Sequence, residues 1–190
     1  MQMPVLETER LIIRPFVLDD LDAVHHLLDD DLGARQTLEA RRQWLQWSVL
    51  NYEQLAHLYQ PPYGDRAIVL RGSGQLIGSC GLVPALILGT LPYYRSLSDK
   101  VAANRAFPEF GLYYGLFREQ RGQGYATEAA QALIDYAFAQ LNLIRIIATT
   151  TYDNQASMKV MRRLGMQIER NPHPEPAWFQ VVGILENQTA

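Results

Sequence analysis

The residues with the clearest chemical potential in this sequence form a short loop, Arg121-Gly122-Gln123-Gly124, which follows an apolar stretch and precedes a strongly helical one. Glycine allows tight bends and lets a ligand approach the backbone closely. The first N–H groups of a helix have no intrahelical partner, and with the helix dipole they favour an anion such as phosphate. The loop therefore predicts a phosphate site, with an ordinary glycine-rich turn as the alternative.

Two well-known nucleotide motifs do not fit this loop. A Walker loop needs a lysine followed by serine or threonine, and the loop contains no lysine. A dinucleotide-binding loop needs a third glycine where this sequence has Thr127. A phosphate ligand held by main-chain donors is therefore favoured over a nucleotide held by these motifs.

The elements that must position the loop follow from hydrophobic periodicity. Strands are expected over 10–16, 65–70, 76–82, 109–117, 143–150, 166–170 and 178–185, and helices over 18–28, 37–53, 125–141 and 154–164. The segment Pro84–Pro108 has no clear period, and loops of such length are usually functional or disordered. A functional role is therefore expected for this segment. No repeat or linker divides the chain, so a single domain is expected over residues 1–190.

Composition excludes several classes of protein. The 190 residues are 48% hydrophobic and 19% charged, which argues against a disordered chain. The net charge of −3 argues against a nucleic-acid-binding protein. Cys80 is the single cysteine, no zinc-ligand spacing occurs, and no metal is expected. The stretch Val83–Leu91 is too short to span a bilayer and the first ten residues do not resemble a signal peptide, so a cytoplasmic protein without membrane association is expected.

Four stretches of the sequence resemble the GNAT acetyltransferases. Arg121–Ala126 fits the family's Arg/Gln-x-x-Gly-x-Gly/Ala motif, and its extension Gly124–Ala129 resembles the RimJ/RimL branch of ribosomal-protein N-terminal acetyltransferases. Leu6–Phe16 and Leu76–Leu82 are similar to the first and third strands of that branch, and Asn154–Met166 resembles its second cofactor motif. The resemblance covers nearly the whole chain apart from the segment without a clear period.

The resemblance implies a mixed α/β fold, with a centrally splayed sheet of about seven strands flanked by about four helices and acetyl-CoA in the splay. The pyrophosphate would bind the loop's backbone N–H groups, so the donors are main chain rather than charged side chains. The pantetheine arm would pair like an added strand with Tyr114–Leu116. Asn154 would bind the arm, or act as a plain helix N-cap. The implied cofactor-binding residues are Tyr114, Gly115, Leu116, Arg121, Gly122, Gln123, Gly124, Tyr125, Ala126, Thr127 and Asn154.

Glu109 is the candidate base. It stands at the start of the strand that leads to the loop, where relatives often carry a glutamate that acts through water. A shift of two residues in the alignment would place Gly111 there instead, on the same strand face. The alternative role for Glu109 is that of a solvated carboxylate at a strand start.

Ser157 is the candidate donor to the departing thiolate. Many family members use a tyrosine seven residues after the asparagine, but that position here is Met161. The RimL-type resemblance points instead to the serine three residues after Asn154, whose hydroxyl can donate a hydrogen bond. That serine could equally satisfy the backbone near the helix start. Three tyrosines are the alternative donors: Tyr113, Tyr114 and Tyr152.

The resemblance predicts an enzyme that moves the acetyl group of acetyl-CoA to a primary amine by direct attack in a ternary complex. The competing hypothesis is a non-catalytic acyl-CoA-binding sensor or partner module, and the methionine at position 161 is its support. The acceptor stays open between a protein N-terminus and a small-molecule amine. The segment Pro84–Pro108 is expected to cover the acceptor side and to shape specificity. A monomer or a homodimer is expected, with no nucleic-acid or membrane partner.

Overall fold

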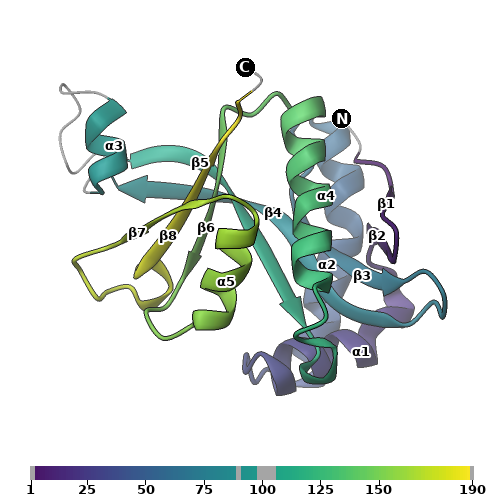
Figure 1. Ribbon diagram of the computed structural model, residues 1–190. Coiled ribbons are helices and arrows are strands. Elements are labelled where there is room, and N and C mark those ends of the chain that lie inside the picture. The colour runs from purple at the N-terminus through teal and green to yellow at the C-terminus, as the bar shows by residue number, and fades with distance from the viewer. Residues whose placement is uncertain (1–2, 89–90, 98–105, 189–190) are drawn as a thin grey trace. The chain divides into compact units, whose positions relative to one another are not determined.

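The computed structural model describes residues 3–88, 91–97 and 106–188 (Figure 1). The chain forms two compact units, each made of two stretches of sequence. The first unit comprises Met1–Leu82 and Tyr113–Tyr136, and the second comprises Val83–Leu112 and Ala137–Ala190. Each unit contains its own apolar core.

Among the described residues the strands form one mixed sheet of eight strands in the order β1-β2-β3-β4-β5-β6-β8-β7. β5 and β6 are parallel, whereas the pairs β1–β2, β2–β3, β3–β4, β6–β8 and β7–β8 are antiparallel. The strands are β1 (Leu6–Glu7), β2 (Leu11–Pro15), β3 (Gly64–Leu70), β4 (Leu76–Leu88), β5 (Ala106–Leu116), β6 (Arg145–Thr150), β7 (Gln167–Arg170) and β8 (Val181–Glu186). The long strands β4 and β5 contribute residues to both units.

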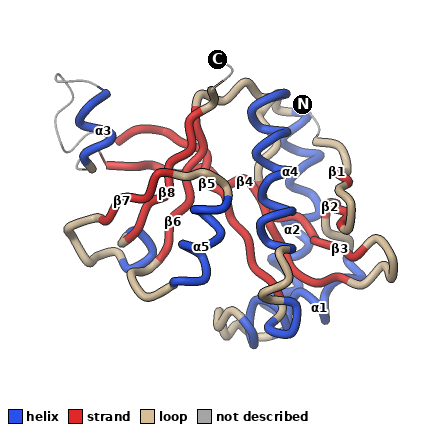
Figure 2. Tube along the Cα trace, in the orientation of Figure 1, coloured by secondary structure: helices blue, strands red, loops and turns tan. Residues whose placement is uncertain are grey.

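Five α-helices occur in the described part of the chain (Figure 2). They are α1 (Leu21–His25), α2 (Leu38–His57), α3 (Pro92–Leu97), α4 (Tyr125–Gln140) and α5 (Gln155–Arg163). None of the helices within the described ranges is both long and apolar enough to cross a membrane. The mixed α/β architecture expected from the resemblance is confirmed, with one strand and one helix more than expected.

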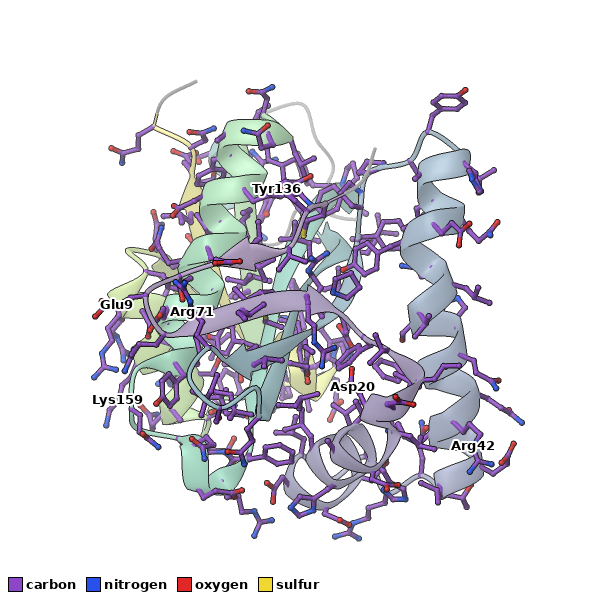
Figure 3. The ribbon with its side chains drawn as sticks, turned by 90° about the vertical axis from the view of Figure 1, so that its right-hand side faces the viewer. Glu9, Asp20, Arg42, Arg71, Tyr136 and Lys159 are labelled. Carbon is purple, nitrogen blue, oxygen red and sulfur yellow. The ribbon has the colours of Figure 1, made fainter. Side chains whose placement is uncertain are left out.

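The core of the first unit lies between the early helices and the face of β3. Val24 and Leu27 from the first helical region, Leu45 from α2, and Ala67 and Val69 from β3 are all buried in one cluster. The alternation of Ala67 and Val69 places both on the same sheet face. Figure 3 shows that α2 and α4 lie on opposite sides of β2 and β3, so both faces of these strands are covered by helices.

The core of the second unit contains residues from β4, α3, β6 and β8. Ile87, Tyr94 and Ile147 are fully buried, and Val182 and Ile184 pack with them. The strands β6 and β8, which contribute Ile147, Val182 and Ile184, both come from apolar stretches of the sequence, as expected for buried strands. The cluster holds α3 against the strands of its own unit.

The segment Pro84–Pro108 differs from the sequence-based expectation. β4 continues to Leu88, α3 occupies Pro92–Leu97, and β5 begins at Ala106. Within it Ile87, Leu91 and Tyr94 are fully buried core residues, so its described part is not an irregular loop. A helix of six residues and a strand extension are too short to produce a detectable period, which explains why the sequence pattern missed them. Residues 89–90 and 98–105 of the segment lie outside the described residues.

Candidate functional site

The glycine-rich loop connects β5 to α4 within the first unit. β5 ends at Leu116, a 3₁₀ turn covers Arg118–Gln120, and α4 begins at Tyr125. Gly122 and Gly124 have φ values of +80° and +86°, in the left-handed region where a side chain is strained. The sharp bend at the helix entrance therefore requires glycine at both positions.

Two features of this loop fit a phosphate group. A Cβ added at Gly122 would meet no atom within 4 Å, so the backbone there borders open space. The Thr127 hydroxyl, in the first turn of α4, is buried and has no hydrogen-bond partner among the described residues. Since buried polar atoms are nearly always paired, an unpaired hydroxyl beside an open helix N-terminus suits a ligand with acceptor oxygens.

Two arginines and an aspartate fix the loop to the rest of the first unit. The Arg118 backbone N–H donates to Asp31 Oδ2 over 2.9 Å, and its guanidinium lies 3.1 Å from the same carboxylate. Arg121 Nε donates to the Leu116 carbonyl over 3.1 Å. The Arg118 side chain is 69% exposed, so its positive charge is accessible to an anion at the loop. Sequence reasoning missed Asp31, because nothing in its local pattern links it to a loop almost ninety residues later.

A second anchor joins the N-terminal region to the first turn of α4. Glu128 accepts hydrogen bonds from Thr8 Oγ1 over 2.6 Å, from the Arg10 backbone N–H over 2.9 Å and from Arg10 Nε over 2.6 Å. Arg10 also donates to the Gln123 carbonyl and lies 4.5 Å from the centre of the Tyr125 ring. Arg10 therefore contacts the loop at Gln123 and the first residue of α4, Tyr125.

The electrostatics of Glu128 follow from these contacts. Burial alone would raise the pKa of its carboxyl, but hydrogen bonds from Thr8 and Arg10 outweigh burial and hold the pKa below its ordinary value. A carboxylate in the first turn of a helix is also stabilised by the helix dipole. Glu128 is therefore charged at neutral pH and acts as a fixed link between the loop and β2.

β5 approaches β4 closely in the stretch expected to pair with a pantetheine arm. A Cβ at Gly78 would lie 2.3 Å from the Gly115 carbonyl oxygen, so the two strands can meet this closely only where β4 has glycine. Among the described residues, β5 and β6 are paired in register at Gly111 and Ile147, and β5 then continues to Leu116. The parallel ladder is therefore short compared with the length of β5.

Asn154 and Ser157 stand at the start of α5, in the second unit. Asn154 is the N-cap, and its Oδ1 accepts the Ser157 backbone N–H over 3.0 Å. Asn154 therefore has the N-cap role that was its alternative, and its side-chain carbonyl oxygen performs it. Its cofactor role stays a prediction, as does the thiolate-donor role of Ser157. The glycine loop, in contrast, belongs to the first unit.

Glu109 is not the solvated carboxylate that was its alternative role. Its side chain is only 4% exposed, and Oε1 accepts a hydrogen bond from Arg145 Nε over 2.6 Å. The Arg145 guanidinium also lies 5.8 Å and 5.3 Å from the ring centres of Tyr93 and Tyr94. The sequence offered no signal for Arg145, because β5 and β6 are far apart along the chain. The base role of Glu109 stays a prediction.

The Glu109–Arg145 pair lines an open groove in the second unit. The groove has a volume of about 540 Å³ and is lined by residues 84–86, 108–110 and 142–145. Burial, followed by the charge of Glu109, raises the pKa of Tyr94. The buried hydroxyl of Tyr94 makes no hydrogen bond to any of the described residues. Tyr94 is therefore a neutral phenol at physiological pH.

The alternative tyrosine donors have different surroundings. The Ser79 hydroxyl lies 3.2 Å from the Tyr113 hydroxyl, and burial raises the pKa of Tyr113 above its ordinary value. Tyr152 donates its hydroxyl hydrogen bond to the Asn171 carbonyl. Cys80 is fully buried, and burial raises the pKa of its thiol, so it packs as a small apolar core residue.

Comparison with known proteins agrees with this geometry. The model of the acetyltransferase (GNAT) domain matches residues 10–167. The chain is 29% identical over 167 residues to the uncharacterized N-acetyltransferase YoaA of Bacillus subtilis, covering 87% of this chain and 84% of the relative. It is 24% identical over 160 residues to the spermidine N(1)-acetyltransferase of Escherichia coli K12, covering 83% and 73% of the two chains.

Solved structures share the fold. An acetyltransferase from Agrobacterium tumefaciens superposes with a TM-score of 0.68 at 24% identity, covering 98% of this chain and 96% of the other. Mycobacterium smegmatis RimJ in complex with CoA-disulfide superposes with a TM-score of 0.64 at 17% identity, covering 94% and 83%. With the family model spanning most of the sequence, from β2 to β7, the chain belongs to the GNAT family of acetyl-CoA-dependent N-acetyltransferases.

Proposed function

We propose that the protein transfers the acetyl group of acetyl-CoA to a primary amine by direct attack in a ternary complex, and that it belongs to the RimJ/RimL-like branch. The observation that carries the proposal is the loop Arg121–Gly124, with two left-handed glycines at the N-terminus of α4. Resemblance of the Gly124–Ala129 stretch to the branch motif supports the finer assignment.

Acetyl-CoA, when bound, supplies an activated thioester. In this proposal the backbone N–H groups of Gly122–Thr127 bind its pyrophosphate, and Arg118 adds positive charge nearby. The stretch of β5 from Tyr114 to Leu116 lines the pantetheine arm, and Asn154 binds it from the start of α5. Open space beside Gly122 and the unpaired hydroxyl of Thr127 support the pyrophosphate assignment.

The two compact units are proposed to act as a single GNAT domain over residues 1–190. The sheet order passes through both, and the family model begins in one unit and ends in the other. The proposal includes a cytoplasmic location and either a monomer or a homodimer. Size-exclusion chromatography with light scattering distinguishes the two assembly states.

Glu109 as base and Ser157 as thiolate donor are the proposed catalytic residues from the sequence. A base that removes the amine proton becomes less important once the solution itself deprotonates the amine. Glu109→Gln is therefore expected to lose more activity at pH 7 than at pH 9. Equal fractional loss at both pH values would assign Glu109, with its partner Arg145, a structural role.

The acceptor class requires a direct screen. The curated E. coli relative is named for spermidine, whereas the branch resemblance suggests a protein N-terminus. Release of CoA thiol is measured with spermidine and with a short peptide that has a free N-terminal alanine, followed by mass spectrometry of the products. Acetylation of one of them supports the transferase. Tight acetyl-CoA binding with no transfer to any amine would favour the non-catalytic module.

A further inference from the structure

A half-buried carboxylate in the first unit has no role in the site described above. Asp65 lies on β3, paired in register with Gly81 on β4. Among the described residues no hydrogen bond or salt bridge reaches its carboxylate. Because a carboxylate away from bulk water is normally paired, an unpaired one that remains partly accessible is suited to a cationic ligand.

The surroundings of Asp65 include two hydroxyl groups, those of Ser79 and Tyr113. The neighbour across the sheet, Gly81, has no side chain, and the two strands pack so closely there that a Cβ would lie 2.3 Å from the Gly64 carbonyl oxygen. Ser79 pairs with Ala67, two residues along from Asp65, so it occupies the same sheet face. The Ser79 hydroxyl lies 3.2 Å from that of Tyr113, and Tyr113 also interacts electrostatically with Asp65.

The cation that acts electrostatically on Asp65 is already committed to another partner. Arg41 on α2 donates Nε to Asp29 Oδ2 over 2.8 Å and Nη2 to Oδ1 over 2.9 Å, and both side chains are almost fully buried. Its charge attracts the Asp65 carboxylate, but no hydrogen bond joins the two. A bidentate arginine pair is geometrically specific, so Arg41 cannot turn to Asp65 without leaving Asp29. Asp65 therefore keeps its acceptor oxygens for an incoming donor.

The proton affinity of Asp65 suits this task. Burial raises the pKa of its carboxyl to about 6, and Arg41 partly opposes the increase. The other titratable groups that interact with it electrostatically are Tyr52 from α2, Tyr113 from β5 and Cys80 from β4, all neutral because burial raises their pKa values. A base whose pKa lies close to the working pH is charged and still accepts a proton.

We propose that Asp65 binds the ammonium group of the acceptor amine and accepts its proton, with Tyr113, held by Ser79, forming the wall beside it. This inference rests on the proposed acetyl transfer to an amine. Tyr113 immediately precedes the Tyr114–Leu116 stretch of β5 assigned to the pantetheine arm, so the acceptor and the arm would lie along consecutive residues of one strand.

The ammonium nitrogen gives one proton to the Asp65 carboxylate and regains its lone pair. The amine nitrogen then forms a bond to the acetyl carbon, the carbon–sulfur bond breaks, and its electron pair stays on sulfur. The second nitrogen proton neutralises the thiolate, and Asp65 returns its proton to water. The products are the acetamide, CoA thiol and one released proton.

Asp65 is a different kind of carboxylate from Glu109. This inference assigns to Asp65 the proton-accepting role proposed above for Glu109, because Oε1 of Glu109 is bound to Arg145, whereas neither oxygen of Asp65 has a hydrogen-bonded partner among the described residues. An α-amine, with an ordinary pKa of about 7.7–8.0, requires a smaller uphill proton transfer to Asp65 than an alkylamine near 10.4. The arrangement therefore favours an N-terminal amine, and a polyamine would bind but react more slowly.

The test compares Asp65→Asn with wild type and with Asp22→Asn, which makes the same charge change at an exposed position of α1. Binding of the N-terminal-alanine peptide and of spermidine is measured by calorimetry in the presence of CoA. Acetyl transfer is measured from pH 5 to pH 9. Since a hydrogen bond to a charged group is worth about 1.5–3 kcal/mol, Asp65→Asn should weaken amine binding by about 10- to 100-fold, and Asp22→Asn should not.

Wild type should also show a rise in kcat/KM centred near pH 6 that Asp65→Asn lacks, with the acetyl-CoA Kd unchanged. Thermal melting shows whether the variant is folded, and Tyr113→Phe provides a second variant that keeps the charge. If wild type acetylates an amine and Asp65→Asn matches it in amine affinity and pH profile, the Asp65 assignment is wrong while the transferase stands. If wild type acetylates nothing, the binding comparison alone still decides whether Asp65 holds an amine.

Discussion

Arg10 and Glu128 are separated by more than a hundred residues, yet the Arg10 guanidinium lies 2.6 Å from the Glu128 carboxylate and 4.5 Å from the centre of the Tyr125 ring. The contact joins the start of β2 to the first turn of α4. Because Arg10 also donates to the Gln123 carbonyl, it fixes the loop whose backbone donors the proposed function requires. The stability of this part of the first unit should therefore depend on the charge of Glu128.

Replacing Glu128 with glutamine tests this link. The pKa of Glu128 is held below its ordinary value of 4.5, so its contribution to folding is present above that pH and is lost as the pH falls through the lower folded value. Glu128→Gln should lower the free energy of unfolding by about 1–3 kcal/mol at pH 7 and by much less at pH 3. Urea denaturation at both pH values measures the difference.

The matched control for that variant is Glu39→Gln, which removes a mostly exposed partner of Arg42. Exposed ion pairs contribute little, so this control should be nearly neutral at both pH values. A Glu128→Gln effect that is the same at pH 3 and pH 7 would contradict the assigned role of its charge.

A glutamate in place of Gly124 tests the phosphate loop. The change adds a strained side chain at φ +86° and a negative charge where phosphate is expected, so acetyl-CoA binding should be lost. Gly74→Glu is the control, because Gly74 has φ +71° and open space but lies in the turn before β4. Calorimetry should show binding lost at position 124 and retained at position 74. Equal affinity in both variants would remove the loop from the cofactor site.

The sequence was sufficient to predict the elements with long, regular patterns. The apolar stripe of α4 and the cap at Asn154 predicted both helices within a residue or two. The partners Arg145 and Asp31, and the isolated position of Asp65, could not be predicted, because they depend on which strands lie side by side. The short helix α3 was also missed, since its burial comes from tertiary packing of Tyr94 rather than from a local period.

Breaking the buried pair between Glu109 and Arg145 should be costly. Arg145→Met leaves an uncompensated carboxylate whose side chain is 4% exposed, and such losses typically cost about 3–5 kcal/mol. The double change Glu109→Gln with Arg145→Met should recover much of that loss, because the buried charge is then gone. Arg42→Met, at a mostly exposed pair, is the control and should change the free energy of unfolding little. A double variant less stable than Arg145→Met would show that the charge is not the cause.

Removal of the Ser157 hydroxyl should affect turnover rather than binding. In the proposed role it stabilises the departing thiolate, an interaction made in the transition state, so Ser157→Ala should lower kcat with little change in the acetyl-CoA Kd. A proton-transfer group usually contributes at least about 10²-fold to the rate. The loss of kcat in Ser157→Ala should be near or below that value, because water can replace a hydroxyl. Asn154 would still cap the helix through the backbone N–H at position 157. Full kcat in Ser157→Ala would assign the donor to a tyrosine or to water.

Acetyl transfer to an amine is tested most directly by measuring CoA thiol release under single-turnover conditions, with mass spectrometry of the acceptor. Wild-type protein, acetyl-CoA and the N-terminal-alanine peptide should yield one acetylated amine for each thiol released, and Gly124→Glu should yield neither. Acetyl-CoA that binds to wild type but is never consumed, with this peptide, with spermidine or with other primary amines, would contradict the account and identify the protein as a binding module.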